Sequence, residues 1–188
     1  MQTNIKESSA TLNRIGMVAR WQPPHLGHAA ILQKLCSISN QVFIGIGSSN
    51  TYNYRCPFKL EETSTMLKLV LRDFSNYTLI PVPDLHNGPK WRLMLKELFQ
   101  DLDTLFTANP YVASLMQADY NIQHPLTLLA PHEQIKVEGQ MVRKKIAQNG
   151  NWQTLVTPEI ADYIIEHQLD SRFRKEFGLQ TLAIETLI

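Results

Sequence analysis

The sequence predicts an α/β fold: a parallel sheet of five strands, helices on both of its faces, and a C-terminal helical extension. Short apolar runs typical of buried strands alternate along the chain with longer segments of helical periodicity. Such alternation indicates a parallel sheet whose strands are connected by helices. The length of 188 residues fits one domain, which we place at residues 14–188, after a polar N-terminal tail at residues 1–13.

Each predicted strand is a short run of apolar or β-branched residues that ends at turn-forming residues. The first reads Ile-Gly-Met-Val-Ala and is followed by Pro23-Pro24, which holds the backbone extended. The five strands are expected at residues 15–19, 42–46, 77–82, 104–107 and 126–129. Together they would form a Rossmann-like sheet.

The helices are predicted from apolar positions three and four residues apart and from their first and last residues. The first helix begins near His25. Pro110 suits the first turn of a short helix, and Thr157 before Pro158 fits an N-cap followed by a first helical position. The other helices are expected at residues 60–71, 90–99 and 138–148.

The bulk composition argues against several classes of protein. The formal net charge of +1 disfavours a nucleic-acid-binding surface, which is normally clearly basic, so no nucleic-acid partner is expected. The N-terminal residues lack the apolar stretch of a signal peptide, and no apolar run approaches the ~20 residues that span a membrane. We therefore expect a soluble, cytoplasmic protein with no membrane partner.

The cysteines and scattered histidines do not suggest a metal site. Cys36 and Cys56 are too few for a disulfide framework or a zinc motif. Cys36 falls in an apolar helical run and is expected in the core, whereas Cys56 falls in a loop. His86, His124 and His132 are spread over predicted loops. No protein-borne metal centre is expected.

The most informative stretch is residues 20–28, which read Arg-Trp-Gln-Pro-Pro-His-Leu-Gly-His. A spacing of three places His25 and His28 on the same side of the first helical turn. The free N–H groups and the dipole of that turn attract anions. Gly27 leaves room for a nucleotide, and Arg20 and the imidazoles are placed to stabilise a five-coordinate phosphoryl centre. Either histidine alone would equally fit a surface helix cap.

Unusual sequences follow four of the predicted strands at the point where each strand ends. In a parallel sheet these ends share one edge, and ligands bind there, near the point where the strand order reverses. We therefore expect four segments to converge on one face: residues 20–28, 48–58, 83–91 and 109–110.

These motifs resemble those of the nucleotidyltransferase superfamily, whose signature is a His-x-Gly-His element after the first strand. Within it, the chain is similar to the small archaeal-type nicotinamide mononucleotide (NMN) adenylyltransferases, from about residue 15 to about residue 166. His25-Leu-Gly-His28 carries the likeness to the superfamily, and Asp84 with Trp91 carries the likeness to the subfamily. Further matches are Arg55-Cys-Pro-Phe58 with Glu62, Asn109-Pro110, and Gly139 with Arg143.

The resemblance implies an enzyme that transfers the adenylyl group of ATP to NMN, forming NAD and releasing pyrophosphate. The acceptor phosphate would attack the α-phosphorus of ATP directly and in line, and magnesium would enter with ATP. The implied small-molecule partners are ATP, NMN and NAD. Nicotinate mononucleotide remains an alternative acceptor, and a homo-oligomer remains open.

The same resemblance implies the roles of individual residues. The residues expected to act in catalysis are His25, His28, Arg20 and Arg143. The residues expected to bind nucleotide are Gln22, Gly27, Arg55, Asp84, Asn87, Trp91, Asn109 and Gly139. The histidines would face the triphosphate and the arginines would contact phosphates. Trp91 would stack on the nicotinamide ring, and Asp84 or Asn87 would hydrogen-bond to its carboxamide.

The chain departs from the family pattern at the start of a later helix. Where the family has serine and threonine around the glycine, this chain has Glu138 and Gln140. A hydroxyl there donates to phosphate, whereas the Glu138 carboxylate adds negative charge, which Lys136 could relieve. Thr63 also stands where the family has an arginine.

Two alternative functions follow from these residues. Glu138 and Gln140 favour a catalytically weakened module that binds nucleotide or NAD. Retained catalysis with another acceptor, as in cytidylyl or phosphopantetheine transferases, is disfavoured by Asp84 and Trp91.

Overall fold

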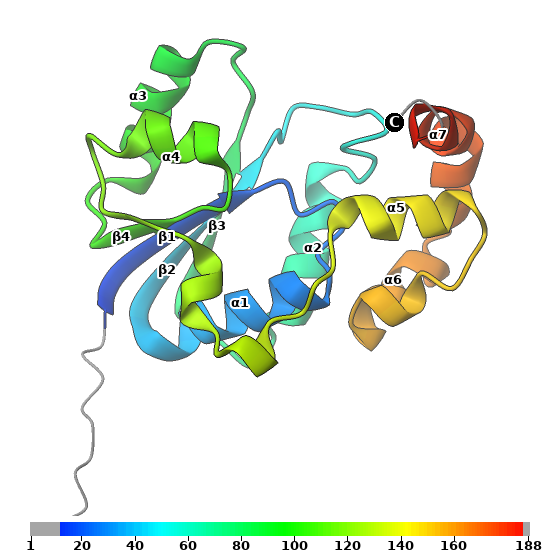
Figure 1. The fold of residues 1–188 in the computed structure, drawn as a ribbon, viewed down its shortest axis with the longest axis horizontal. Helices are drawn as coiled ribbons and strands as arrows, with labels where there is room; N and C mark the ends of the chain where they lie inside the picture. The colour runs from blue at the N-terminus through cyan, green and yellow to red at the C-terminus, as the bar shows by residue number, and fades with distance from the viewer. Residues whose placement is uncertain (1–11, 186–188) are drawn as a thin grey trace, which may run out of the picture.

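The sheet is parallel throughout, with five strands in the order β3-β2-β1-β4-β5 (Figure 1). The computed structural model describes residues 12–185. The strands are β1 (Leu12–Ala19), β2 (Ser39–Gly47), β3 (Tyr77–Val82), β4 (Thr104–Phe106) and β5 (Ile122–Gln123). The strand order reverses between β1 and β4, so the loops after these two strands are neighbours at the carboxyl edge of the sheet.

Helices cover both faces of the sheet. Figure 1 shows α1 (Leu26–Ile38) and α2 (Leu60–Val70) on one face and α3 (Gly88–Phe99) and α4 (Pro110–Met116) on the other. The helices of the C-terminal extension, α5 (Gly139–Ala147), α6 (Pro158–Glu166) and α7 (Leu169–Glu185), lie beside α2. Short 3₁₀ helices occur at Pro125–Leu128, Pro131–Glu133 and Gln153–Leu155.

Each face of the sheet has its own apolar core, because successive strand residues point to opposite faces. Ile15 and Ile44 are fully buried in the larger core, which also takes in residues of α1, α2, α5, α6 and α7. Val18 and Phe43 face the smaller core with Phe99 of α3. Because one core joins the sheet to α5 and α7, these C-terminal helices are fixed relative to the strand ends.

The predicted fold class is confirmed, but the predicted fifth strand at residues 126–129 is wrong. That segment is largely a 3₁₀ helix, and the fifth strand is the two-residue β5. Pro125 has no backbone N–H to give to a ladder, and the His124 side chain accepts a hydrogen bond from the N–H of Leu126. A strand as short as β5 has no periodicity that a sequence pattern could reveal.

At the beginning of one strand and of one helix, the structure differs from what the sequence predicts. Leu12 and Asn13, assigned to the polar tail, are the first residues of β1, and residues 1–11 lie outside the described part of the chain. Thr157 does occupy the N-cap of α6, with Pro158 next to it, but its hydroxyl makes no capping hydrogen bond.

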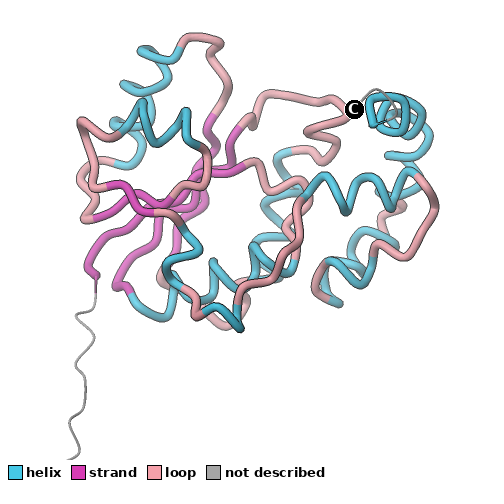
Figure 2. Tube along the Cα trace, viewed as in Figure 1, coloured by secondary structure: helices cyan, strands magenta, loops and turns pink. Residues whose placement is uncertain are grey.

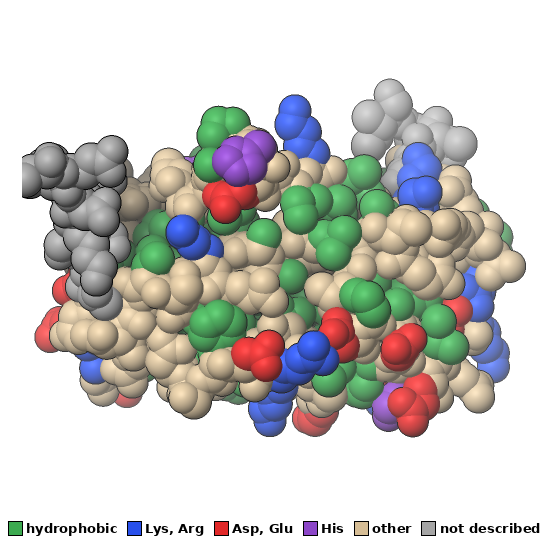
Figure 3. All heavy atoms as spheres, turned by 90° about the horizontal axis from the view of Figure 1, so that it is seen from below, with side chains coloured by type: hydrophobic (Ala, Val, Ile, Leu, Met, Phe, Trp, Pro, Cys, Tyr) green, Lys and Arg blue, Asp and Glu red, His purple; other side chains and the backbone are tan. Residues whose placement is uncertain are grey.

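The surface and the loops add two observations. On the face shown in Figure 3, Lys and Arg side chains lie among Asp and Glu, so the described residues there form no patch of one sign. None of the helices described within residues 12–185 is long and apolar enough to cross a membrane. Figure 2 shows long loops leaving the carboxyl edge of the sheet, where the predicted site residues lie.

Candidate active site

The turn between β1 and α1 places the two predicted histidines in contact. The rings of His25 and His28 stack with centroids 3.6 Å apart, and the rings of Trp21 and His28 meet in a T-shaped arrangement with centroids 4.7 Å apart. Trp21 adopts a left-handed backbone conformation (φ 56°), which is rare for a bulky residue. Its indole N–H donates to the carbonyl of Gly45 at 2.8 Å, which anchors the turn to β2.

Both imidazoles are neutral at pH 7. Burial and then the charge of Arg143 lower the pKa of His25 from 6.5 to about 4. Burial and then His25 hold the pKa of His28 well below 6.5. His25 Nδ1 accepts from the backbone N–H of His28 at 3.3 Å, so the proton of His25 is on Nε2. His28 Nδ1 is enclosed and has no partner among the described residues.

We expect the stability of the protein to fall as the pH drops from about 6.5 to about 4. Over this range the unfolded chain takes up protons on His25 and the folded protein does not, so stability present above pH 6.5 is lost. The shift of His25 corresponds to about 3 kcal/mol. Urea unfolding at several pH values should show this slope, and His25→Asn, which keeps an N-cap acceptor, should reduce it and leave the part that comes from His28. His132→Asn at an exposed site is the control, and an unchanged slope in His25→Asn would contradict the assignment.

Gly27 lies against the chain's own backbone. A Cβ atom at this position would come within 2.9 Å of the carbonyl oxygen of Ile135 and within 3.3 Å of the His25 ring. The missing side chain therefore lets the segment before α5 approach the histidine turn. A direct contact of Gly27 with nucleotide stays a prediction.

Three arginines from different segments gather beside this turn: Arg20 and Arg55 from loops and Arg143 from α5. Burial first, then Arg20 and more weakly Arg55, lower the pKa of Arg143 from 12.5 to about 10. Arg143 Nη1 donates to the carbonyl of Gln22 at 2.6 Å. Within residues 12–185, no carboxylate forms an ion pair with any of the three. Like charges held together without an acidic partner are the arrangement that binds a polyanion.

Gln22 joins two of the predicted segments, and its side chain is fully engaged. Its amide oxygen accepts from the N–H of Phe58 at 2.9 Å, and its amide nitrogen donates to the Phe58 carbonyl at 3.0 Å and to the Thr63 hydroxyl at 3.1 Å. Thr63 is fully buried, so in this chain the position supports Gln22 and does not face a ligand. Gln22 therefore holds the Arg55–Phe58 segment beside the histidine turn.

The loop after β3 places the other predicted residues at the same edge. Asn50 accepts from the N–H of Asp84 at 2.8 Å and donates to its carbonyl at 3.1 Å, which fixes the Asp84 backbone. The side-chain oxygen of Asn87 caps α3 by accepting from Lys90. Trp91 is half-buried in the first turn of α3, within the helix predicted from residue 90, and packs against the smaller core.

The thiol of Cys56 lies within electrostatic reach both of the arginines and of Asp84. Burial raises its pKa, and Arg20 and then Arg143 oppose the effect. The charge of Asp84 raises the pKa of the same thiol, as burial does. Groups from the loops after β1, β2 and β3 and from α5 are thus within electrostatic reach of one another.

The remaining predicted residues begin two helices. Asn109 caps α4 by accepting from the N–H of Tyr111 at 2.9 Å. Gly139 begins α5, and a Cβ there would come within 3.1 Å of both Arg143 and the Gln22 carbonyl. Glu138 is the N-cap of α5, but its exposed side chain makes no capping hydrogen bond.

Sequence reasoning missed two residues that support this site. Asn50 holds Asp84 from across the neighbouring loop. Arg172 of α7 contacts Glu62 and Pro57, which lie 110 and 115 residues earlier in the chain. A lone asparagine in a loop and a lone arginine in a helix carry no spacing signal that could have revealed these partners.

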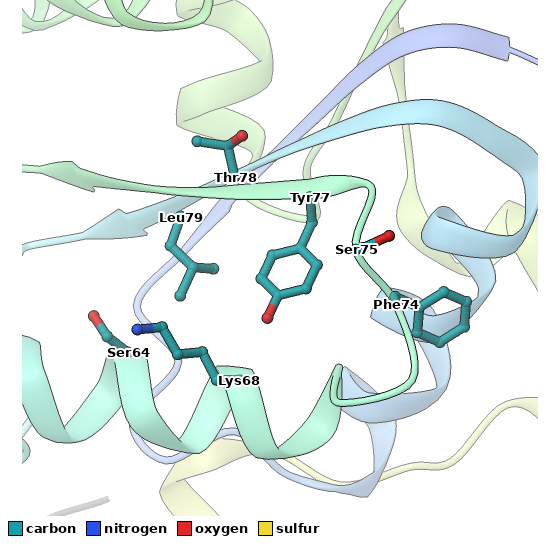
Figure 4. Close-up of a pocket in the computed structure, with 7 residues that line it drawn as sticks. All are labelled: Ser64, Lys68, Phe74, Ser75, Tyr77, Thr78 and Leu79. Atoms are coloured by element: carbon teal, nitrogen blue, oxygen red, sulfur yellow. The ribbon is translucent and has the colours of Figure 1, made fainter.

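A surface hollow of about 560 Å³ lies elsewhere, between α2 and the beginning of β3 (Figure 4). Tyr77 points from the strand toward α2, and Lys68 of α2 is the cation among the residues that line the hollow. The full lining is Ser64, Lys68, Phe74, Ser75, Tyr77, Thr78 and Leu79. Because it opens at the start of β3, the hollow is remote from the carboxyl edge, where the arginines and histidines meet.

A comparison with known protein families decides the kind of protein. A model of the cytidylyltransferase-like family matches residues 17–161, which include the end of β1, the other four strands, the histidine turn and Arg143. The chain belongs to this family. It is a nucleotidyltransferase, as the His25-Leu-Gly-His28 element predicted, and the likeness to archaeal NMN adenylyltransferases is confirmed by individual relatives.

Two such relatives are both described as nicotinamide-nucleotide adenylyltransferase. The protein from Methanococcus maripaludis is 29% identical over 165 residues, which cover 86% of this chain and 94% of the relative. The protein from Methanococcus vannielii is 30% identical over 156 residues, which cover 81% of this chain and 88% of the relative.

Solved structures agree on the fold of this nucleotidyltransferase. A bifunctional NMN adenylyltransferase/ADP ribose pyrophosphatase from Francisella tularensis, complexed with AMP and a manganese ion, matches with a TM-score of 0.70 at 17% identity. The match covers 89% of this chain and 53% of that protein, so the chain spans about half its length. A putative nicotinate-nucleotide adenylyltransferase from Vibrio parahaemolyticus matches with a TM-score of 0.55 at 13% identity, over 82% of this chain and 99% of that one.

Proposed function

We propose that the chain is an NMN adenylyltransferase that joins NMN to the adenylyl group of ATP. An oxygen of the NMN phosphate bonds to the α-phosphorus, the bond from that phosphorus to the bridging oxygen of the β-phosphate breaks, and pyrophosphate leaves. A phosphate monoester has its second pKa near 6, so the attacking oxygen is already deprotonated at pH 7. The protein therefore needs donors and cations but no general base, which suits neutral imidazoles.

The observation that carries the proposal is the cluster of Arg20, Arg55 and Arg143 beside the stacked histidines. Burial and then repulsion from Arg20 lower the pKa of Arg143, and an anion placed among the three arginines would offset that repulsion. The N–H groups of His25 and His28 would donate to oxygens whose charge increases in the transition state, where preorganised donors have their largest effect. Magnesium enters this scheme as part of the substrate MgATP.

The described residues suit a metal ion that arrives with its nucleotide. Within residues 12–185, no three His, Cys, Asp or Glu side chains lie close enough to hold a metal ion by themselves. Magnesium keeps several water molecules and is commonly bound through substrate phosphates. When bound, it would neutralise charge on the departing pyrophosphate.

The residues expected to bind the acceptor would favour NMN, which carries a carboxamide, over nicotinate mononucleotide, which carries a carboxylate. Trp91 would stack on the nicotinamide ring from the first turn of α3. Because the side-chain oxygen of Asn87 already caps α3, its N–H₂ is left to donate to the carboxamide oxygen. The Asp84 carboxylate would accept from the carboxamide N–H₂ and would repel the carboxylate of nicotinate mononucleotide.

The test is pyrophosphate release with MgATP and a panel of acceptors. We expect NMN to be preferred over nicotinate mononucleotide, and Asp84→Asn to lower that preference by about 10–100-fold, since a hydrogen bond to a charged group contributes about 1.5–3 kcal/mol. Asp162→Asn, at an exposed position on α6, is the control. Efficient pyrophosphate release with another acceptor, and none with NMN, would exclude the proposal.

Glu138 is the observation that favours a second candidate, a nucleotide-binding module with weakened catalysis. Its carboxylate stands at the start of the helix that carries Arg143, where the family has a hydroxyl. Two charges ~4 Å apart interact by about 4 kcal/mol at an effective dielectric constant of ~20, so a carboxylate aimed at a triphosphate would oppose binding. The same panel separates the candidates, because a binding module would bind NAD and release no pyrophosphate with any acceptor.

A further inference from the structure

One arginine of the C-terminal helix α7 holds the segment that carries Arg55. Arg172 donates from Nη1 to one carboxylate oxygen of Glu62 at 2.6 Å and from Nη2 to the other at 2.7 Å. The same Nη2 also donates to the carbonyl of Pro57 at 3.0 Å. Since Glu62 is in the first turn of α2 and Pro57 lies near the end of the loop after β2, the guanidinium fixes both sides of the loop–helix junction.

A second contact from α7 reaches the same loop. The hydroxyl of Tyr52 donates to the carboxylate of Glu176, and its ring packs edge-on against Phe177 with centroids 5.2 Å apart. Burial and then Glu176 raise the pKa of Tyr52 to about 12, so the hydroxyl remains a donor at neutral pH. Figure 1 shows the loop after β2, in cyan, extending from the strand ends to α7.

The helix α7 also packs along α5, which carries Gly139 and Arg143. The helix α7 therefore contacts two of the segments that carry arginines of the cluster, the loop with Arg55 and the helix α5 with Arg143. It lies at residues 169–185, beyond the residues 17–161 that the family model matches.

The loop itself offers little to hold Arg55 in place. Arg55 is exposed, and the hydrogen bonds near it are local, from the N–H groups of Arg55 and Cys56 to the side chain of Asn53. Arg55 and Arg143 are like charges within electrostatic reach of each other, and after burial and Arg20 the charge of Arg55 contributes a small part of the lowered pKa of Arg143. Two fixed points oppose this repulsion: Gln22 holds Phe58, and Arg172 holds Pro57 and Glu62.

We propose that Arg172 is a positioning residue for the triphosphate, because it holds the Arg55 segment at the separation from Arg143 that a bound phosphate chain requires. This rests on the proposed function only in that the arginine cluster must bind phosphates. Asp84 and Trp91 are held by other contacts. The effect should therefore fall on ATP and spare the acceptor.

The experiment compares Arg172→Lys and Arg172→Gln with the parent protein. Lysine keeps the charge but cannot contact both oxygens of Glu62 and the Pro57 carbonyl together. We expect the dissociation constant of a non-hydrolysable ATP analogue and the KM for ATP to rise about 10-fold, with kcat and the acceptor KM changed less than about 3-fold. The matched control is Arg174→Gln, because Arg174 is on the same helix with similar exposure and pairs only within it, with Asp170 and Ser171.

A double-mutant cycle with Glu62→Gln tests whether the ion pair carries the effect. The two substitutions should together raise the dissociation constant hardly more than Arg172→Gln alone. Equal rises in the KM values of both substrates, or unchanged analogue affinity in Arg172→Gln, would show a purely structural role. A parent protein that binds the analogue but makes no NAD would contradict the proposed function and leave the Arg172 comparison valid. A parent that does not bind the analogue would contradict both.

Discussion

Replacing His28 with alanine is expected to lower turnover by about 10²–10³-fold while the protein stays folded. The ring is held by His25 and Trp21, so its orientation is fixed before a nucleotide binds. Removing one donor aimed at transition-state charge has an effect of this size. Pyrophosphate release at saturating ATP and NMN measures it.

The control for this substitution is His132→Ala, at an exposed position outside the histidine turn. Circular dichroism and thermal unfolding should confirm that both variants are folded, because loss of the His28 ring also removes packing against Trp21. Near-parent turnover in a folded His28→Ala protein would leave the proposed chemistry without its central donor.

Replacing Arg143 with alanine is expected to lower kcat/KM by about 10²–10³-fold. The KM for ATP should rise more than the KM for the acceptor. The side chain has two tasks, to supply positive charge to the cluster and to hold the Gln22 carbonyl. Arg143→Lys restores the charge without the planar fork and should recover part of the loss, to about 10-fold below the parent.

Arg72→Ala is the matched control, since Arg72 is an exposed arginine that follows the last turn of α2 and pairs with Glu159 of α6. Steady-state kinetics with each substrate varied in turn separates the two KM values. If Arg143→Ala lowered only the melting temperature and left kcat/KM intact, its role would be confined to supporting Gln22.

The sequence predicted what depends on local spacing. The strand at residues 77–82 and the helix that follows His25 are as expected, because periodicity and turn residues act over a few positions. β5 was not predicted because it consists of only two residues, both of which pair with β4. The 3₁₀ helix after it was mistaken for a strand because its leucines suit either structure.

The individual roles of site residues were predictable only in part. The spacing of His25 and His28 indicated their contact, and the resemblance indicated that Arg55 and Arg143 share a site. The partners of Gln22 are 36 and 41 residues away, and those of Arg172 are more than a hundred. Such pairings are decided by the packing of α2, α5 and α7 against the sheet, which no local pattern encodes.

The hydrogen bonds of Gln22 have a consequence for the thermodynamics of ligand binding. Its side chain is 6% exposed and already joins the Phe58 segment to the histidine turn, while Arg143 holds its carbonyl. The conformational entropy lost in ordering these loops is therefore lost during folding and not when a ligand arrives. Preorganisation of this kind strengthens affinity without any additional contact, and it lets association proceed without waiting for a loop to close.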